Sequence, residues 1–509
     1  MKLLAILSTL AAVATSSLVA AYTNPLTIQH YKFYDSKTGK YVGVRGVDYY
    51  PRPNAGELDV NNYDFFTDDH ADIWGPDIEE LAALGANAVR LYAVDPTKSH
   101  DRFMCALRSR GMYALVDLGA SCENCAVTKD KFPTCYPAEL KTRGEQIITA
   151  FAKYDNVMAF SAGNEVNHFA KVASDNAPCQ KKFIRDMRAF LGKCKTLRDV
   201  PVGVVLADKD RQDNAIYYNC RTDPSDTYEN AEWYGLNVYL HCDGKVTDPT
   251  TIGAGFQKLT NDFASYKMNI PVMLTEFGCL NPSFPTIDGY DAQRNWVQAA
   301  WLHSKELREQ FNGGFVFEYS TENANSKADS PWPFTKYGAQ NYGLGYYEPK
   351  NCDHQTTKCV YKRMPNFENL AKQYNATNYD DEPLMTAFKP SADKSAFPAC
   401  PAGFAKLKDS TWAADSIQSM ACPAAYQAYT CPGQTASGNL AGSTSKNTNN
   451  STDSRAGEES GVAPGTSPSG TTGATSTSKP TNPTTSSAMV HVQAALALGV
   501  ASVAVASYV

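Results

Sequence analysis

The chain has 509 residues, a formal net charge of −6 and 20% charged residues. No run of lysine or arginine forms a basic patch, so the sequence argues against a nucleic-acid partner. The fourteen cysteines, an even number, are typical of a chain that folds in the oxidising secretory pathway.

The first 21 residues predict a secretory signal peptide. One lysine precedes an apolar run, and Val19 and Ala21 are small residues at the spacing that signal peptidase requires. Cleavage after Ala21 would leave a mature chain that begins at Tyr22.

Residues 22–390 predict one large domain with eight strands. Apolar, β-branched or aromatic runs recur along it, with helical patterns between several of them. These runs are "KYVGVRGVDYY", "NAVRLYAV", "GMYALVDLG", "NVMAFSAGNE", "VPVGVVLAD", "EWYGLNVYL", "IPVMLTEFG" and "GGFVFEYS". Alternation of strand and helix indicates a parallel sheet, and eight repeats indicate an α/β fold of the (β/α)₈ TIM-barrel type. An open doubly wound sheet is the alternative, weakened because no strand–GxGxxG–helix unit occurs.

Three helices can be placed between these strands. Asp77–Leu84 should be helical and end at Gly85, because glycine commonly terminates helices. Pro178 suits the first position of a helix whose apolar residues recur from Phe183 to Leu191. A further apolar stripe covers residues 296–301.

Carboxylates at the predicted strand ends are the candidate catalytic residues, because barrel enzymes act at that face. They are Asp48, Asp117, Glu165, Asp208, Glu276 and Glu318. Most are expected to be structural, since a carboxylate at a strand end often caps the next helix. Glu165 ends the fourth strand and Glu276 the seventh, so the two should face each other across the mouth of the barrel.

Cleavage of a glycosidic bond typically needs two facing carboxyl groups, one protonated and one ionised. Asn164 suits a hydrogen bond to the sugar 2-hydroxyl. Neighbours in a strand point to opposite faces, so Asn164 and Glu165 can both serve only where the strand breaks up. Gly163 would permit that break.

Other mechanisms have less support in the sequence. The eight histidines show no HExxH or other ligand spacing, so we expect no catalytic metal, and we expect no cofactor. No GxSxG elbow occurs, so a serine nucleophile has no support. Cys122 and Cys125 could suggest a zinc or redox site, but secretion makes a disulfide the better interpretation.

The C-terminal part of the chain divides into three segments. Residues 391–432 hold Cys400, Cys422 and Cys431 and predict a small disulfide-tied appendix. Residues 433–487 are rich in Ser, Thr, Gly, Asn and Pro and predict a disordered, O-glycosylated stalk. Acceptor sequons for N-glycosylation occur at Asn375, Asn449 and Asn450.

The last segment predicts a glycosylphosphatidylinositol (GPI) anchor. The apolar tail from Ala494 is shorter than the roughly 20 residues of a bilayer span, and no lysine or arginine follows it. With small residues just upstream, this pattern indicates removal of residues 488–509 and anchoring at Ser486. A single-span or tail-anchored protein is the alternative.

The order of several motifs resembles one family. "GVDYY", "RLYAVDPTKSHDRFMCAL", "YALVDLGA", "AGNEV", "YGLNVYLHCDG", "TEFGC", "NGGFVFEYS" and "QNYGLG" follow one another as in the fungal GPI-anchored β-1,3-glucanosyltransferases, the Gas and Gel proteins of glycoside hydrolase family seventy-two. The resemblance extends from about Pro25 to Gly345. It implies a retaining enzyme that cuts an internal β-1,3-glucan bond and passes the new reducing end to another glucan chain.

The resemblance also implies roles for single residues. Glu165 matches the acid/base and Glu276 the nucleophile, with their carboxylates about 5 Å apart. The positions expected to hold the sugar or the nucleophile are Tyr92, Asp117, Asn164, Tyr239 and Tyr319, although Phe317 is close enough in sequence to confuse the last assignment. A Cys242–Cys279 disulfide is the pairing most readily carried over.

The sequence departs from the family pattern in three places. Tyr50 stands where the family usually has Gln, and Leu240-His241 replaces Glu-Trp. A cysteine that the family pairs with the position of Cys105 is missing, whereas extra cysteines occur at 122, 125, 135, 179 and 194. If residues 183–194 form one helix, Cys179 and Cys194 are about 20 Å apart and cannot bond to each other.

Three functions are compatible with this pattern. A cell-wall glucanosyltransferase at the outer face of the plasma membrane is favoured, with glucan chains as donor and acceptor. A β-1,3-glucan hydrolase would use the same two glutamates, and a non-catalytic glucan-binding wall protein would need neither. Nothing in the sequence indicates an oligomer, and we expect a monomer.

Overall fold

The structure is a computed structural model that describes residues 23–58, 63–119, 124–239, 246–278, 295–321 and 342–432. These residues belong to one compact unit that ends at Gly433. Several predicted features lie outside the described residues: the signal peptide, Cys122, Leu240-His241, Cys242, Cys279, the stalk with Asn449 and Asn450, and the anchor site Ser486. No helix in the described part of the chain is long and apolar enough to cross a membrane.

Eight parallel strands form a closed barrel at the centre of this unit, in the order β10-β3-β4-β5-β6-β7-β8-β9. Their bounds are β3 Val44–Asp48, β4 Ala88–Leu91, β5 Tyr113–Asp117, β6 Val157–Asn164, β7 Val202–Ala207, β8 Tyr234–Val238, β9 Val272–Phe277 and β10 Gly313–Val316. Each lies within one of the eight runs predicted from the sequence. The predicted (β/α)₈ barrel is therefore confirmed.

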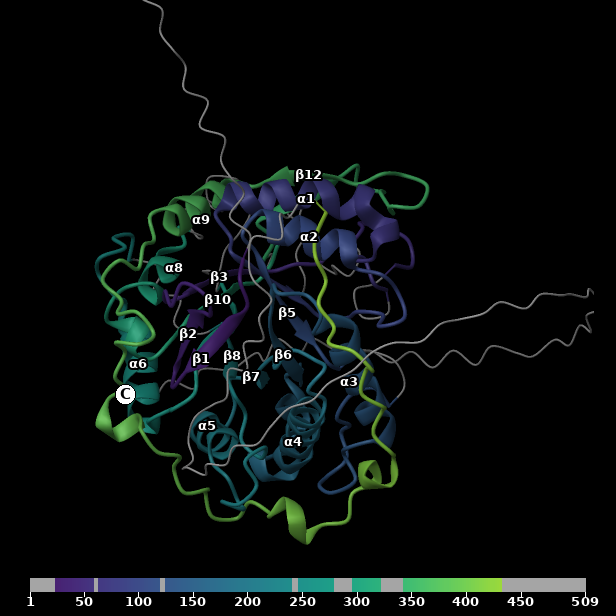
Figure 1. The fold of residues 1–509 in the computed structure, drawn as a ribbon. Coiled ribbons are helices and arrows are strands. Elements are labelled where there is room, and N and C mark those ends of the chain that lie inside the picture. Colours follow the sequence, from purple (N-terminus) through teal and green to yellow (C-terminus); the bar gives the residue numbers. More distant parts are fainter. Residues whose placement is uncertain are drawn as a thin grey trace, which may run out of the picture. The chain divides into compact units, whose positions relative to one another are not determined.

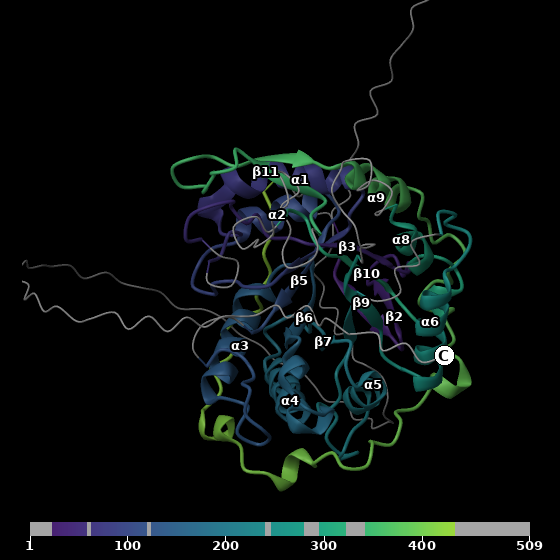
Figure 2. The same cartoon turned by 180° about the vertical axis from the view of Figure 1, so that it is seen from behind.

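Helices surround the barrel (Figures 1 and 2). They are α1 Ala71–Leu84, α2 Asp101–Ser109, α3 Ala138–Phe151, α4 Ala177–Lys193, α5 Arg211–Asn219, α6 Ala254–Tyr266, α8 Val297–Leu302 and α9 Pro365–Asn375. Helix α1 ends at Gly85 as predicted, where φ is 83°, but it begins six residues before Asp77. In α4, Pro178 lies in the first turn and the predicted apolar face is buried against the barrel.

A short hairpin that the sequence did not predict closes the N-terminal end of the barrel. Strands β1 (Leu26–Gln29) and β2 (Lys32–Asp35) pair antiparallel. Leu26 and Phe33 from this hairpin pack with residues that start the barrel strands, such as Val44 and Tyr113. The amide of Asn312 ties the hairpin to β10 by donating to the carbonyl of Tyr31 at 2.8 Å. This end is thus filled, and the opposite end is left for the site.

A second small sheet lies beside α1. Strands β11 (Gly345–Glu348) and β12 (Val360–Arg363) pair antiparallel, and Figure 2 shows β11 next to α1. Arg363 forms ion pairs with Glu80 of α1 at 2.6 Å and with Glu368 of α9 at 2.8 Å.

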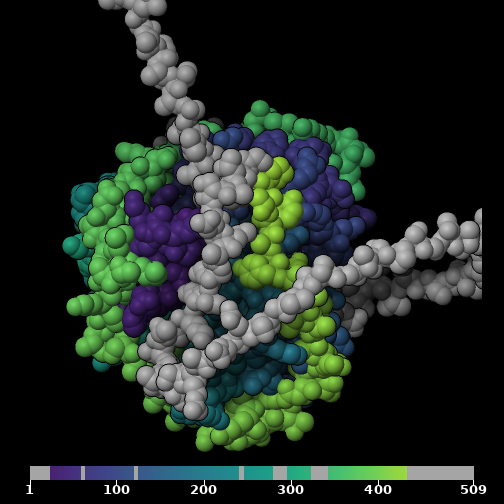
Figure 3. Space-filling model, in the orientation of Figure 1, coloured from purple at the N-terminus to yellow at the C-terminus, as the bar shows by residue number. Residues whose placement is uncertain are grey.

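The predicted appendix, residues 391–432, is a strap that runs along the outside of the helices (Figures 1 and 3). Its three cysteines each form a disulfide with a cysteine of the barrel unit and not with one another. Cys400 bonds to Cys220 at the end of α5, Cys422 to Cys194 at the end of α4, and Cys431 to Cys105 in α2. Cys105, whose usual family partner is missing from this sequence, is therefore bonded to Cys431 instead.

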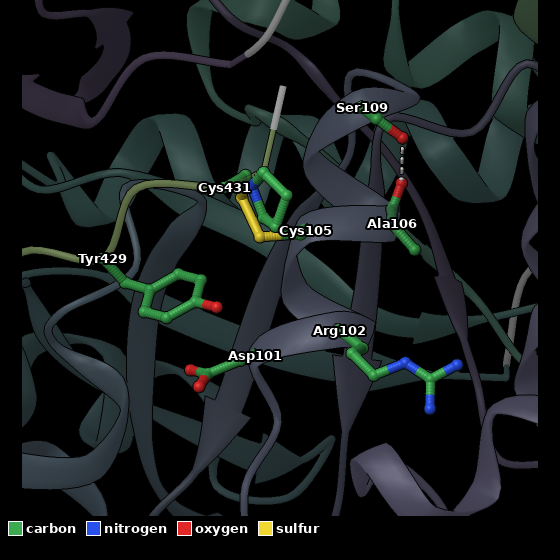
Figure 4. Close-up of a pocket in the computed structure, with 8 residues that line it drawn as sticks. Asp101, Arg102, Cys105, Ala106, Ser109, Tyr429 and Cys431 are labelled. Atoms are coloured by element: carbon green, nitrogen blue, oxygen red, sulfur yellow. Dashed lines mark hydrogen bonds between the residues drawn. A yellow bond between two sulfur atoms is a disulfide. The ribbon is translucent and has the colours of Figure 1, made fainter. Parts of the chain in front are cut away.

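Packing adds to these covalent ties. Trp412 is buried and its ring lies 5.5 Å from that of Phe132, while Phe404 stacks on Tyr217 at 3.9 Å. Lys141 of α3 donates to strap carbonyls at 2.7 and 3.2 Å. Figure 4 shows the Cys105–Cys431 disulfide beside a pocket of about 320 Å³, which is lined by one face of α2 from Asp101 to Ser109 and by Tyr429 of the strap.

The remaining described cysteines are also paired. Cys135 bonds to Cys179, and Cys352 to Cys359. Because Cys194 bonds to the strap, the prediction that Cys179 and Cys194 do not bond to each other is confirmed. Cys125 is disulfide-bonded, as the disulfide interpretation of Cys122 and Cys125 requires.

Candidate active site

The fourth barrel strand breaks up at the rim, as predicted. Strand β6 ends at Asn164, and its register with β7 shifts between Ser161 and Asn164. Gly163 has a φ of 112°, and Glu165 itself has a φ of 51°. Such a left-handed conformation is costly for a residue other than glycine, and strained backbone of this kind is enriched at functional sites. The break lets Asn164 and Glu165 both enter the hydrogen-bond network of the mouth.

Glu276, on β9, is buried and accepts three hydrogen bonds. Its Oε1 accepts one from Arg90 Nη1 at 2.9 Å and one from the Tyr92 hydroxyl at 2.8 Å. Its Oε2 accepts one from the Tyr239 hydroxyl at 2.5 Å. Three donors, one of them a guanidinium, favour the ionised form of a carboxyl group. Glu276 is therefore arranged to be a carboxylate.

Glu165 is in a different environment. It is partly exposed, and among the described residues its Oε1 accepts a hydrogen bond from Asn237 Nδ2 at 2.9 Å. Burial, and after it the charge of Glu276, raises the pKa of Glu165 to about 7, although the Asn237 bond and Arg90 oppose the rise. A carboxyl group with this pKa can hold a proton near neutral pH and give it up again.

A continuous chain of hydrogen bonds joins the two glutamates. The Oδ1 of Asn164 accepts from Arg90 Nη2 at 2.8 Å and from Asn237 Nδ2 at 3.2 Å. Arg90 also bonds Glu276, and Asn237 also bonds Glu165. No described residue accepts a hydrogen bond from Asn164 Nδ2, so this group can donate to a ligand. The two carboxyl groups are thus fixed relative to each other through three intervening side chains, those of Asn237, Asn164 and Arg90.

Arg90 is the charged centre of this network and has no solvent exposure. Burial alone would lower the pKa of Arg90, but the acidic groups that face it, among them Glu276, outweigh burial and raise the pKa. Asp117, another predicted site residue, is also buried beside Arg90. Burial raises the pKa of Asp117 to about 7, and its Oδ1 accepts from the backbone N–H of Gly119 at 2.9 Å.

Aromatic rings surround the carboxylates. Tyr92 packs edge-to-face on Tyr50 with 5.3 Å between ring centroids, and Tyr239 packs edge-to-face on Phe317 at 5.9 Å. Tyr50 stands at a position where the sequence departs from the family pattern, and its hydroxyl donates to Glu318 Oε2 at 2.7 Å. These rings provide the apolar surface on which a sugar can stack.

Tyr319, predicted to bind the sugar, lies outside this cluster in the structure. Its side chain is fully buried, its hydroxyl donates to Asp77 Oδ1 at 2.9 Å, and its ring stacks on Tyr361 at 4.2 Å. Phe317, two residues earlier, is the aromatic residue that reaches Tyr239. The other predicted residues, Tyr92, Asp117, Asn164, Glu165, Tyr239 and Glu276, are brought together.

The structure adds residues that the sequence did not single out, chiefly Arg90 and Asn237. Each stands inside an apolar strand run, in "NAVRLYAV" and "EWYGLNVYL". A charged or amide side chain inside such a run was an available signal, because burying it requires hydrogen-bond partners. The predicted glycosylation site Asn375 lies at the exposed end of α9.

Comparison with known proteins points to one family. The sequence profile described as glucanosyltransferase, of glycoside hydrolase family 72, matches residues 15–327. The 1,3-beta-glucanosyltransferase PGA4 of Candida albicans is 30% identical over 347 residues, which are 68% of this chain and 65% of that protein. The 1,3-beta-glucanosyltransferase GAS5 of Saccharomyces cerevisiae is 28% identical over 369 residues, 71% of this chain and 67% of that protein.

Solved structures agree with this result. Saccharomyces cerevisiae Gas2p in complex with laminaripentaose has a TM-score of 0.54 and 26% identity, with 70% of each chain covered. The same protein with laminaritriose and laminaritetraose has a TM-score of 0.55 and 25% identity, with 75% of this chain and 74% of that chain covered. Because the profile alone covers more than half of the sequence, the chain belongs to the glucanosyltransferase family, glycoside hydrolase family 72.

Proposed function

We propose that the protein is a β-1,3-glucanosyltransferase that works by retaining double displacement. The observation that carries the proposal is the hydrogen-bonded chain from Glu165 through Asn237, Asn164 and Arg90 to Glu276. It joins one carboxyl group arranged to hold a proton to another arranged to be ionised. Two carboxyl groups in these opposite states are what retaining glycoside cleavage needs.

In the first step, Glu276 attacks the anomeric carbon of the donor glucan and forms an ester to the sugar. Glu165 donates its proton to the leaving glycosidic oxygen, so the departing chain leaves as an alcohol. Asn164 is placed to donate to the 2-hydroxyl, a bond that tightens in the transition state. Glu165 is then a carboxylate.

In the second step, a hydroxyl group of an acceptor glucan attacks the ester. Glu165 removes the hydroxyl proton and returns to its starting state, while Glu276 leaves as a carboxylate. The acceptor chain is now longer, and the configuration of the anomeric carbon is retained after two inversions. Water in place of the acceptor would give hydrolysis.

Support for a β-1,3-glucan substrate comes from the relatives. The curated relatives are named 1,3-beta-glucanosyltransferases, and Gas2p binds laminari-oligosaccharides. The proposal includes secretion and a GPI lipid at Ser486, which would hold a monomeric enzyme at the outer face of the plasma membrane, in the cell wall. The five disulfides within the described part of the chain support folding in an oxidising compartment.

The test is to incubate the secreted protein with reduced β-1,3-glucan oligosaccharides and to follow the size of the products. Products longer than the starting chain are expected. Shorter products alone would show a hydrolase, and bound but unchanged oligosaccharides would show a non-catalytic glucan-binding protein. Either result would overturn the proposal.

Variants connect this assay to the site. Glu165→Gln and Glu276→Gln should each lower turnover by about 10³-fold or more while the fold is kept. Asp208→Asn is the matched control, because Asp208 also follows a barrel strand but pairs with Arg211 at 2.6 Å, outside the network. A folded Glu165→Gln variant with near-normal activity would refute the assignment of the site.

A further inference from the structure

Asp48, the last residue of β3, is a third carboxyl group beside the nucleophile. It has no solvent exposure, and neither of its side-chain oxygens has a hydrogen-bond partner among the described residues. The nearest cation is Arg90, whose Nη1 lies 3.6 Å from Asp48 Oδ1. That distance is too long for a hydrogen bond between these groups.

The Nη groups of Arg90 are directed at residues other than Asp48, and its Nε has no hydrogen-bond partner among the described residues. Its Nη1 donates to Glu276 at 2.9 Å, and lies 3.1 Å from both the carbonyl oxygen of Thr275 and the hydroxyl of Tyr92. Its Nη2 donates to Asn164. Arg90 therefore donates a hydrogen bond to Glu276, whereas it interacts with Asp48 only through its charge, at 3.6 Å.

Other groups that face Asp48 come from each neighbouring element. They are Tyr92 beyond β4, Glu276 of β9 and Tyr374 of α9, while the backbone N–H of Tyr319, after β10, donates to the Asp48 carbonyl. Arg90 is the only cation in this set. Burial raises the pKa of Asp48 far above its usual value, Arg90 opposes the rise, and the charge of Glu276 adds to it. The nearby Tyr92 hydroxyl also opposes the rise, but its single proton is donated to Glu276.

A buried carboxylate without donors is far more costly than a buried neutral acid. If Asp48 were ionised, two carboxylates would compete for one guanidinium, and the three groups would carry a net charge of −1. If Asp48 is protonated, Arg90 and Glu276 balance each other.

We propose that Asp48 stays protonated beside the nucleophile, so that the positive charge of Arg90 is matched to Glu276 alone. The proposal rests on the proposed function for the role of Glu276, but the protonation of Asp48 can be tested without any glucan. Asp48 takes no part in the reaction itself; as a neutral acid it adds no second negative charge beside Arg90.

The decisive experiment is the pH dependence of thermal unfolding in the wild-type protein and in Asp48→Asn. An amide has nearly the size of a neutral acid and no charge. Above about pH 4 the unfolded wild-type chain loses the Asp48 proton, whereas the folded chain keeps it. Relative to Asp48→Asn, the wild type should therefore lose about tenfold in its folding equilibrium constant per pH unit as the pH rises from about 4. The difference in melting temperature should grow in favour of Asp48→Asn.

Asp101→Asn is the control with the opposite sign. The Asp101 carboxylate accepts from the Tyr154 hydroxyl at 2.7 Å and pairs with Lys153 at 3.0 Å. Although partial burial opposes it, these partners lower the pKa of Asp101. Removing the charge should therefore destabilise the protein above the pKa of the unfolded chain, and the loss should fade as the pH falls. The control shows that the measurement resolves the sign of a single carboxyl group.

Activity provides the second measurement. Asp48→Asn should keep kcat/KM for β-1,3-glucan oligosaccharides within about threefold of the wild type, because the charges of Arg90 and Glu276 remain balanced. A hundredfold loss in kcat at unchanged KM, or a stability deficit that grows with rising pH, would show that Asp48 is an ionised partner of Arg90 and would overturn the proposal. Failure of Asp48→Asn to fold would also overturn it, since an amide replaces a neutral acid with little change. Failure of the proposed function would appear instead in wild-type protein that does not act on glucan.

Discussion

The pKa of Glu165 sets the pH at which the enzyme loses its general acid, and Asn237 controls it. Asn237 Nδ2 donates to Glu165 Oε1 at 2.9 Å, a bond that stabilises the ionised form. We predict that Asn237→Ala raises the pKa of Glu165 from about 7. Glu165 must be protonated to assist the leaving group, so the alkaline limb of the kcat/KM profile should move to higher pH.

The size of the shift follows from the hydrogen bond. A bond to a charged group contributes about 1.5–3 kcal/mol, which corresponds to roughly 1–2 pKa units. Glu165 is partly exposed, and water can replace part of the lost bond, so we expect a shift of about one unit. The rate at the optimum should fall as well, because Asn237 also holds Asn164.

The assay is the initial rate of oligosaccharide consumption, measured well below KM between about pH 4 and pH 9. Thr275→Val is the matched control. The Thr275 hydroxyl donates to Asn237 Oδ1 at 2.8 Å, so this variant perturbs the same amide without removing the bond to Glu165. An alkaline limb that stays in place in Asn237→Ala, moves to lower pH, or moves equally in Thr275→Val would refute the reasoning.

Three further predictions concern single side chains. Tyr239→Phe removes a hydrogen bond to the nucleophile and should lower kcat/KM about 10- to 100-fold in a glucan transfer assay, whereas Tyr234→Phe, whose buried hydroxyl bonds to no described residue, should leave it unchanged. Trp412→Ala should lower the free energy of unfolding by about 3–5 kcal/mol in denaturant titrations under non-reducing conditions, and Tyr426→Ala, at a side chain 57% exposed, should not. Tyr319→Phe should lower the melting temperature but leave KM unchanged, because its hydroxyl bonds to a buried aspartate and not to a ligand; a raised KM would contradict this placement.

The barrel could be predicted from the sequence because its strands are buried on both faces and read as continuous apolar runs. The hairpin β1–β2 was not predicted because four residues give too short a pattern, and because "KFYD" includes a lysine, Lys32, that is buried in an ion pair with Glu382 at 2.7 Å. The path of the strap could not be predicted because it depends on disulfides between residues that are 180 to 326 positions apart. Spacing along the chain carries no information on such pairs.

The two glutamates could be predicted because a barrel brings the ends of its strands together. Arg90 and Asn237 were not singled out, since their importance depends on which side chains face them across the barrel. Tyr319 lies outside the cluster for a local reason. Residues 317 and 319 would share a face if β10 continued, but the strand ends at Val316, and the chain then directs Tyr319 towards Asp77.

The strap is bonded by disulfides to the helices in the reverse of their chain order, first to the end of α5, then to the end of α4, and then to α2. A protease that cuts once anywhere between Cys400 and Cys431 therefore releases nothing, because both new ends stay tethered by sulfur to the barrel. Whatever follows Cys431 along the chain is likewise held by its bond to Cys105, even when the strap upstream has been nicked. A single cleavage in the strap would therefore release no fragment on a non-reducing denaturing gel, and the fragments would separate only after a reductant is added.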